Sequence, residues 1–140
     1  MLIITTGLPG AGKTTFARVW VAADPVARCR VNRDDLRGML FDAHGHLGTA
    51  REAAVTAVER SAVVSLLALG RDVIVDATHL TDHSRAGWAE LAAAMGHDFT
   101  VHRVDTPVDE CIRRDAARAA GGGRGVGAEV IAMLDARRGV

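Results

Sequence analysis

The sequence predicts an α/β fold in which a parallel sheet of about four or five strands is flanked by helices. Short β-rich apolar runs alternate with longer helical patterns along the chain, which is typical of right-handed βαβ crossovers. The 140 residues suffice for one core but not for two, so we expect a single domain over residues 1–140. Apolar residues make up 49% of the chain and charged residues 24%, the balance of a folded globular domain.

In the first half of the chain, each predicted strand is a short apolar run, and each helix is bounded by residues that end helices. The first strand stops at Gly7, and the first helix closes at an Asp-Pro pair. The second helix begins with two aspartates, whose charge suits a helix N-terminus. The elements in order are a strand over Leu2–Thr6, a helix over residues 14–23, a strand over residues 29–32, a helix over residues 33–40, a loop over residues 41–48 and a helix over residues 49–69.

The second half repeats this alternation and includes a glycine-rich segment between its last two helices. The clearest buried strand in the chain is Asp72–Asp76, which reads DVIVD. Asp82 suits the cap of the next helix, and Pro107 suits the first turn of a later one. The elements in order are a strand over Asp72–Asp76, a helix over residues 82–95, a strand over residues 99–105, a helix over Val108–Ala120, a break over residues 121–127 and a helix over residues 128–138.

Composition excludes several classes of protein. Seventeen basic and 17 acidic residues give a formal net charge of zero, so any contact with nucleic acid has to come from a local patch. The longest apolar stretch, residues 62–69, is far shorter than the ~20 residues of a membrane helix, and the first residues already form a strand rather than a signal peptide. Cys29 and Cys111 lie far apart without a CxxC motif, which favours a reducing cytosol and gives no zinc site. We therefore expect a cytoplasmic protein without a membrane partner.

The strongest motif is Gly-Leu-Pro-Gly-Ala-Gly-Lys-Thr at residues 7–14, which fits the phosphate-binding pattern G-x-x-x-x-G-K-[ST] between a strand and a helix. Its glycines let backbone N–H groups surround a phosphate, and the helix dipole adds partial positive charge. Lys13 reaches the β- and γ-phosphates of ATP, and the Thr14 hydroxyl ligates Mg²⁺ together with phosphates and waters. The residues expected to bind the nucleotide here are Gly7, Gly10, Ala11, Gly12, Lys13, Thr14 and Thr15.

Two rare residues restrict the class of P-loop protein. A GTPase reads guanine with an Asn-Lys-x-Asp loop, but the only lysine, Lys13, and the only asparagine, Asn32, lie in other motifs. A mechanical ATPase needs more chain for its coupling elements. A small nucleotide or metabolite kinase fits this length.

Two further segments follow strands, and therefore lie at the carboxyl edge of the sheet beside the P-loop. In the first, Asp34 is placed to accept the proton of an attacking hydroxyl, although Asp34 and Asp35 also suit simple helix capping. In the second, Asp76 has a Walker-B-like place, which suits it to hold a Mg²⁺-bound water or to anchor an arginine such as Arg37. Thr78 is suited to hydrogen-bond a substrate phosphate, and capping of the strand end is the simpler alternative.

The last third of the chain carries a candidate lid. Arg114 and Arg118 are four residues apart on a predicted helix and therefore share a face, just before the glycine-rich segment. Arginines that lead into such a segment are typical of a lid that closes over ATP and neutralises the charge of the transferring phosphoryl group. Arg113 and Arg124 are weaker candidates for this role. A solvated basic helix face is the alternative.

Together, GLPGAGKTTFAR, NRDDLR, VIVDATHL with the following Arg85 and Trp88, DECIRRDAAR and VGAEVI resemble the phage-type polynucleotide 5′-hydroxyl kinase domain over nearly the whole chain. The order and spacing of these motifs are far more specific than the P-loop alone. The resemblance implies a P-loop kinase fold with a C-terminal lid. It also implies transfer of the ATP γ-phosphate, with Mg²⁺, to the 5′-OH end of DNA or RNA, in nucleic acid repair in a bacterial or phage-infected cytosol.

The resemblance also implies roles for single residues. Lys13 and Thr14 match the P-loop pair, Asp34 the general base, Arg37 the arginine on the substrate phosphate, Thr78 a residue near that phosphate, and Arg118 the lid arginine. The implied catalytic residues are Lys13, Asp34 and Arg118, those on the donor phosphates include Arg114, Arg118 and Arg124, and those on the acceptor are Asp34, Arg37, Asp76 and Thr78.

The chain also departs from the family. His79 stands where the family often has asparagine, and the glycines at residues 121–123 make Arg124 a second candidate for the lid role. Some relatives carry an appended 3′-phosphatase or ligase domain. This sequence has no aspartate-rich phosphatase motif and no ligase lysine, so we expect the kinase alone.

Two alternatives stay open. A small-molecule P-loop kinase that acts on a sugar, antibiotic or nucleoside shares the fold and the base, but does not need Arg37 and Thr78 to bind a nucleic-acid phosphate. A regulatory module that hydrolyses ATP slowly needs no acceptor at all, so acceptor-dependent release of ADP separates it from both kinases.

Overall fold

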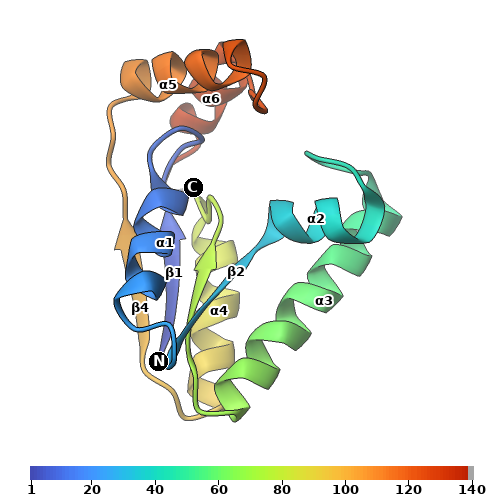
Figure 1. Cartoon of the computed structure of the whole chain (residues 1–140), viewed down its shortest axis with the longest axis vertical. Coiled ribbons are helices and arrows are strands. Elements are labelled where there is room, and N and C mark those ends of the chain that lie inside the picture. Colours follow the sequence, from blue (N-terminus) through green and yellow to red (C-terminus); the bar gives the residue numbers. More distant parts are fainter. Residues whose placement is uncertain (139–140) are drawn as a thin grey trace.

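A four-stranded, wholly parallel sheet forms the centre of the computed structural model, which describes residues 1–138, and helices flank the sheet (Figure 1). The strand order is β2-β3-β1-β4. The predicted α/β fold is thereby confirmed. The elements are β1 (Leu2–Thr6), α1 (Lys13–Ala23), β2 (Arg28–Asn32), α2 (Arg33–Phe41), α3 (Thr49–Ala68), β3 (Asp72–Asp76), α4 (Asp82–Ala94), β4 (Phe99–Arg103), α5 (Val108–Ala120) and α6 (Ala128–Ala136).

Different helices cover the two faces of the sheet, because successive strand residues point to opposite faces. Leu2 of β1 is fully buried in a cluster that includes Val63 of α3 and Trp88 of α4. Its neighbour Ile3 belongs to a second cluster, with Ala17 of α1. The strand is therefore buried on both sides, which explains why β1 is an uninterrupted apolar run.

The order of the strands creates a crevice at the carboxyl edge of the sheet. From β1 the chain passes through α1 to the outer strand β2, whereas from β3 it passes through α4 to β4 on the far side of β1. The chain thus leaves neighbouring central strands in opposite directions, and ligands of open α/β sheets bind at such points. The P-loop follows β1 there, and Asp76 ends β3 there.

The last two helices pack together above this edge of the sheet, across from α2 (Figure 1). A third apolar cluster joins Leu8 of the P-loop to Cys111 of α5 and Ile131 of α6. The P-loop and α5 approach each other so closely at Gly10 that a Cβ atom added there would lie 2.5 Å from the Cys111 carbonyl oxygen. The candidate lid helices are therefore packed against the back of the P-loop.

The predicted boundaries differ from the structure by one residue in α1, β2, α2, α3 and α4, and by two residues in β4 and α6. The strand expected over residues 99–105 ends at Arg103, because its partner β1 ends at Thr6, whose carbonyl oxygen still accepts from the Val104 amide at 2.8 Å. The helix expected to reach residue 138 ends at Ala136, since the next amide bonds three residues back rather than four. The α4 cap is Thr81 rather than Asp82, as the Thr81 side chain accepts from the Ser84 amide. No helix within residues 1–138 is long and apolar enough to cross a membrane.

Candidate active site

A cleft of about 990 Å³ opens at the carboxyl edge of the sheet, bounded by the P-loop, by α2 and by residues of α5, of α6 and of the segment between them. Eight basic and three acidic side chains line it, although the chain as a whole has zero net charge. The basic residues are Lys13, Arg18, Arg30, Arg33, Arg37, Arg114, Arg118 and Arg124, and the acidic ones are Asp34, Asp35 and Asp76. The cleft is therefore a local positive site, suited to a phosphate-rich ligand.

The P-loop presents unpaired backbone amides to this cleft. Gly10 and Gly12 adopt φ angles of 82° and 105°, in the left-handed region that favours glycine. The first hydrogen bond of α1 runs from the Phe16 amide to the Gly12 carbonyl oxygen at 3.0 Å. The amides of Lys13 and Thr14 precede it, and so have no partner inside the helix. Together with the helix dipole, these amides form an anion site that fits the phosphates of a nucleotide.

Two residues expected to bind the nucleotide, Gly7 and Ala11, do not line the cleft. The Gly7 amide donates to the Thr78 carbonyl oxygen at 3.2 Å, and the Ala11 amide donates to the Leu8 carbonyl oxygen at 3.1 Å. Ala11 is also buried in the apolar cluster with Leu8 and Cys111. Because both amides are already paired, these residues shape the loop from behind.

Lys13 is buried beneath the loop, where its Nζ donates to the Leu8 carbonyl oxygen at 2.7 Å. Burial lowers the pKa of Lys13 from 10.5 to about 8, and the nearby Asp76 carboxylate offsets part of that effect. The phosphates of a bound nucleotide would favour the charged ammonium.

This lowered pKa predicts how nucleotide affinity depends on pH. The free protein loses the Lys13 proton as the pH rises above about 8, whereas the complex retains it to higher pH. Binding above that pH therefore takes up a proton, and we expect the Kd for Mg-ATP to rise by up to about tenfold per pH unit. Calorimetric titration in buffers of different ionisation enthalpy measures both quantities. A Kd that stays constant through this range, without proton uptake, would contradict the assignment of Lys13.

Asp76 is the centre of a polar cluster at the base of the cleft and is only 1% exposed. Its Oδ2 accepts hydrogen bonds from Thr14 Oγ1 at 2.8 Å, Arg30 Nε at 2.9 Å and Asn32 Nδ2 at 3.2 Å. Asp76 thus anchors an arginine, but the expectation of Arg37 is wrong. The sheet register pairs Asn32 with Asp76, which places Arg30, two residues earlier on the same face of β2, within reach. Thr14 and Asp76 supply the hard oxygen donors that Mg²⁺ prefers.

Asp34 lies in the first turn of α2 and lines the cleft. The helix cap is Asn32, whose Oδ1 accepts from the Asp35 amide at 2.8 Å, so the capping interpretation of Asp34 is wrong. The Asp34 carboxylate instead accepts hydrogen bonds from the Gly45 amide at 3.3 Å and from Arg124. Partial burial raises the pKa of Asp34, but these donors and the nearby guanidinium groups hold it below its ordinary value. Asp34 is therefore an ionised, half-exposed carboxylate at neutral pH.

The loop between α5 and α6, residues 121–127, is fixed by Asp115, which was not predicted from the sequence. Its carboxylate accepts from the amides of Val126 and Gly127 at 2.9 Å each, and from Arg118 Nη2 at 2.8 Å. Arg124, which the same loop carries, reaches across the cleft to Asp34. The only sequence signal of Asp115 is its place three residues before Arg118, one turn back on the same helix face.

The remaining candidates divide into two groups. Thr15, Thr78 and Arg114 line the cleft as expected of nucleotide or acceptor contacts. His79 is buried outside the cleft with its Nδ1 2.8 Å from the Thr5 carbonyl oxygen. Within residues 1–138, no three histidine, cysteine or acidic side chains gather as a metal-binding group.

The parallel sheet, the P-loop cradle and the carboxylate beside it define a P-loop domain of the kinase type. The chain belongs to the AAA domain family AAA_33, whose model matches residues 2–139. The resemblance inferred from the sequence is also confirmed, since the chain is similar in structure to a chain of the Pnkp1/Rnl/Hen1 complexes.

Three solved structures illustrate the likeness. A chain of the Pnkp1/Rnl/Hen1 RNA repair complex matches with a TM-score of 0.85 and 29% identity over 97% of this chain. A second Pnkp1/Rnl/Hen1 complex gives a TM-score of 0.74 and 33% identity over 81%. The protein spans only 43% and 38% of those two chains. The Mycobacterium tuberculosis APS kinase CysC, in complex with AMPPNP and APS, matches with a TM-score of 0.62 and 28% identity, over 90% of this chain and 79% of its own.

Proposed function

We propose that this protein is an ATP-dependent polynucleotide 5′-hydroxyl kinase that acts in nucleic acid repair, transferring the γ-phosphate of ATP to the 5′-OH end of DNA or RNA. The observation that carries the proposal is the placement of Asp34 and Arg37, one helical turn apart on α2, in the same cleft as Lys13. One cleft thus combines a base for a hydroxyl, a guanidinium for an acceptor phosphate and a cradle for donor phosphates.

In the proposed reaction, Asp34 accepts the proton of the 5′-hydroxyl as its oxygen attacks the γ-phosphorus, and the bond to the ADP oxygen breaks. The P-loop amides and Lys13 hold the β- and γ-phosphates in place. Arg118 and Arg124 neutralise the charge that develops on the transferring group. Mg²⁺, held by Thr14 and through water by Asp76, would supply further positive charge at the phosphate oxygens.

The acceptor is recognised through the phosphate on the 3′ side of its terminal nucleoside. Glu52 accepts from Nε and Nη2 of Arg37 at 2.8 and 3.0 Å, and Asp34 accepts from Nη1 at the longer distance of 3.4 Å. We infer that an acceptor phosphate binds at the Nη1–Nη2 edge of the guanidinium. Thr78 lines the same cleft and offers a hydroxyl donor. A neutral chain with a local positive cleft favours a short footprint on the nucleic acid.

Replacing Arg37 with alanine tests this recognition. We expect a higher KM for the acceptor and a loss in kcat/KM of about 1.5–3 kcal/mol, the range for a hydrogen bond to a charged group. The loss should appear with a nucleoside 3′-monophosphate and be small with the plain nucleoside. Arg60→Ala is the matched control, because Arg60 packs over Trp88 away from the cleft. Equal losses with both acceptors would mean that Arg37 does not bind the phosphate.

A second candidate is a kinase of a small nucleotide-like acceptor. The likeness to APS kinase favours it, since this chain covers 79% of that chain and matches it at 28% identity. The two free cysteines fit a place in a reducing bacterial or phage-infected cytosol under either proposal.

A further inference from the structure

We propose that Glu52 is a positioning residue for the acceptor site, because it holds the Arg37 guanidinium through Nε and Nη2 and leaves only Nη1 in a long, 3.4 Å contact with Asp34. The identity of the acceptor rests on the function proposed above. The orientation of Arg37 does not depend on that function, and the experiment below tests the positioning role and the proposed function separately.

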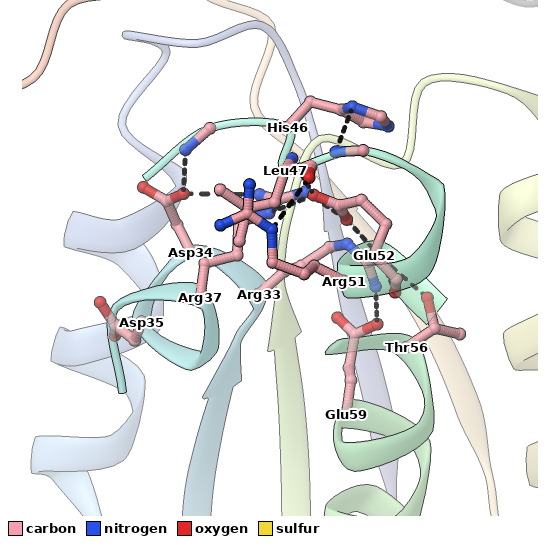
Figure 2. Close-up of polar contacts among 12 residues, drawn as sticks. Arg33, Asp34, Asp35, Arg37, His46, Leu47, Arg51, Glu52, Thr56 and Glu59 are labelled. Carbon is pink, nitrogen blue, oxygen red and sulfur yellow. Dashed lines mark hydrogen bonds and ion pairs between the residues drawn. The ribbon is translucent and has the colours of Figure 1, made fainter. Parts of the chain in front are cut away.

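Glu52 binds the Arg37 guanidinium through two parallel hydrogen bonds. Its Oε1 accepts from Arg37 Nε at 2.8 Å and its Oε2 from Nη2 at 3.0 Å (Figure 2). Such a paired contact fixes the plane of the guanidinium as well as its position. The Glu52 side chain is only 11% exposed. Arg37 and Arg33, together with the Leu47 amide, hold the pKa of Glu52 at about 2 although burial opposes this, so Glu52 is ionised at every working pH.

The same carboxylate also ties down the loop that reaches Asp34. Glu52 Oε1 accepts from the Leu47 amide at 3.0 Å, in the segment that joins α2 to α3. Two residues earlier, the Gly45 amide donates to Asp34 at 3.3 Å. One buried side chain of α3 therefore sets both the arginine expected on the acceptor phosphate and the loop beside the base.

A second arginine, Arg33, also binds the Glu52 carboxylate and helps to hold it in place. Arg33, one turn before Arg37, donates to Glu52 Oε2 at 2.7 Å and to Glu59 Oε2 at 2.9 Å (Figure 2). Thr56 Oγ1 accepts from Arg33 as well, at 2.8 Å. Glu52 and Glu59 are thus two buried glutamates of the same helix that share Arg33, whereas Glu52 is the one that contacts Arg37.

Without Glu52, the neighbouring carboxylate available to Arg37 is Asp34, whose Oδ1 already lies 3.4 Å from Nη1. The guanidinium would turn onto Asp34, cover the base and withdraw the edge that faces the acceptor. Loss of Glu52 should therefore impair use of the acceptor phosphate, and not merely lower stability.

The test compares Glu52→Gln with Glu59→Gln, which makes the same change in the same helix but leaves the Arg37 contact intact. The first readout is selectivity, the ratio of kcat/KM for a nucleoside 3′-monophosphate to that for the plain nucleoside. We expect Glu52→Gln to reduce this ratio about tenfold or more, chiefly through KM, and Glu59→Gln to change it less than about twofold. The second readout is the exchange of the Arg37 Nε–H with solvent, followed by NMR and assigned by the signal that Arg37→Lys removes.

The NMR readout stands whether or not the acceptor is a nucleic acid. The Arg37 Nε–H should exchange slowly in the wild type and in Glu59→Gln, and rapidly in Glu52→Gln. Fast exchange in the wild type overturns the inference even if Glu52→Gln fails to fold. Wild-type selectivity in Glu52→Gln overturns it while the proposed function stands. A wild type that phosphorylates no 5′-hydroxyl overturns the proposed function, and slow exchange that depends on Glu52 would still support the positioning role.

Discussion

Replacing Lys13 with alanine is expected to lower kcat/KM for ATP by at least about 10³-fold while the fold is retained. The buried ammonium donates to the Leu8 carbonyl oxygen of the P-loop, and the proposed function has it contact the β- and γ-phosphates. Its burial costs free energy of folding, since the pKa of Lys13 is lowered to about 8, so its removal should not lower the melting temperature. Steady-state kinetics and thermal unfolding of the same preparation measure both effects.

Lys13→Arg is the informative companion variant. The charge is kept, but a planar guanidinium cannot take the place of a compact ammonium that donates to the Leu8 carbonyl oxygen at 2.7 Å. We expect this variant to lose nearly as much kcat/KM for ATP as Lys13→Ala does. If the arginine variant were active, the donor phosphates would not require a compact ammonium at this position, and the role proposed for Lys13 would be contradicted.

Replacing Asp34 with asparagine is expected to lower kcat by about 10²–10⁴-fold with little change in ATP affinity, because a general base is lost and the nucleotide cradle is not. The amide can still accept from the Gly45 N–H, which keeps the loop in place. The ion pair with Arg124 is lost, so the arginine has to find a new partner. Rapid-quench measurement of the chemical step, with a 5′-hydroxyl oligonucleotide as acceptor, isolates the effect on kcat.

The neighbouring aspartate provides a matched control. The Asp35 side chain is 64% exposed against 31% for Asp34, and it pairs with Arg30 Nη1 at 2.8 Å rather than with Arg124 of the loop between α5 and α6. Asp35→Asn removes the same charge from the same helix turn and should change kcat by no more than a few fold. If the two effects came out reversed, the base would be Asp35.

The features that the sequence predicted well are those that depend on a local pattern of residues. The buried run of β1 and the spacing of the P-loop are encoded within about a dozen consecutive residues, so they could be read without knowledge of packing. The carboxyl-edge rule then brought Asp34 and Thr78 to the same cleft, because both follow parallel strands.

What could not be predicted depends on which elements become neighbours. Arg30 reaches Asp76 across 46 residues because β2 pairs with β3, and Glu52 reaches Arg37 because α3 packs against α2. The cap of α2 was missed for a different reason. Asn32 and the aspartates after it compete for one helix end, and the extended backbone at Asn32 decides the outcome.

The central claim is transfer of the ATP γ-phosphate to a polynucleotide 5′ end, and a panel of acceptors tests it most directly. Radiolabelled ATP with Mg²⁺ is offered separately to a 5′-hydroxyl oligonucleotide, a nucleoside 3′-monophosphate, a free nucleoside, adenosine 5′-phosphosulfate, sugars and aminoglycosides. We expect label on the 5′ oxygen of the oligonucleotide and of the nucleoside 3′-monophosphate, little on the free nucleoside, and none on the other acceptors. Label on a small-molecule acceptor but not on the oligonucleotide would contradict the claim and identify the protein as a small-molecule kinase.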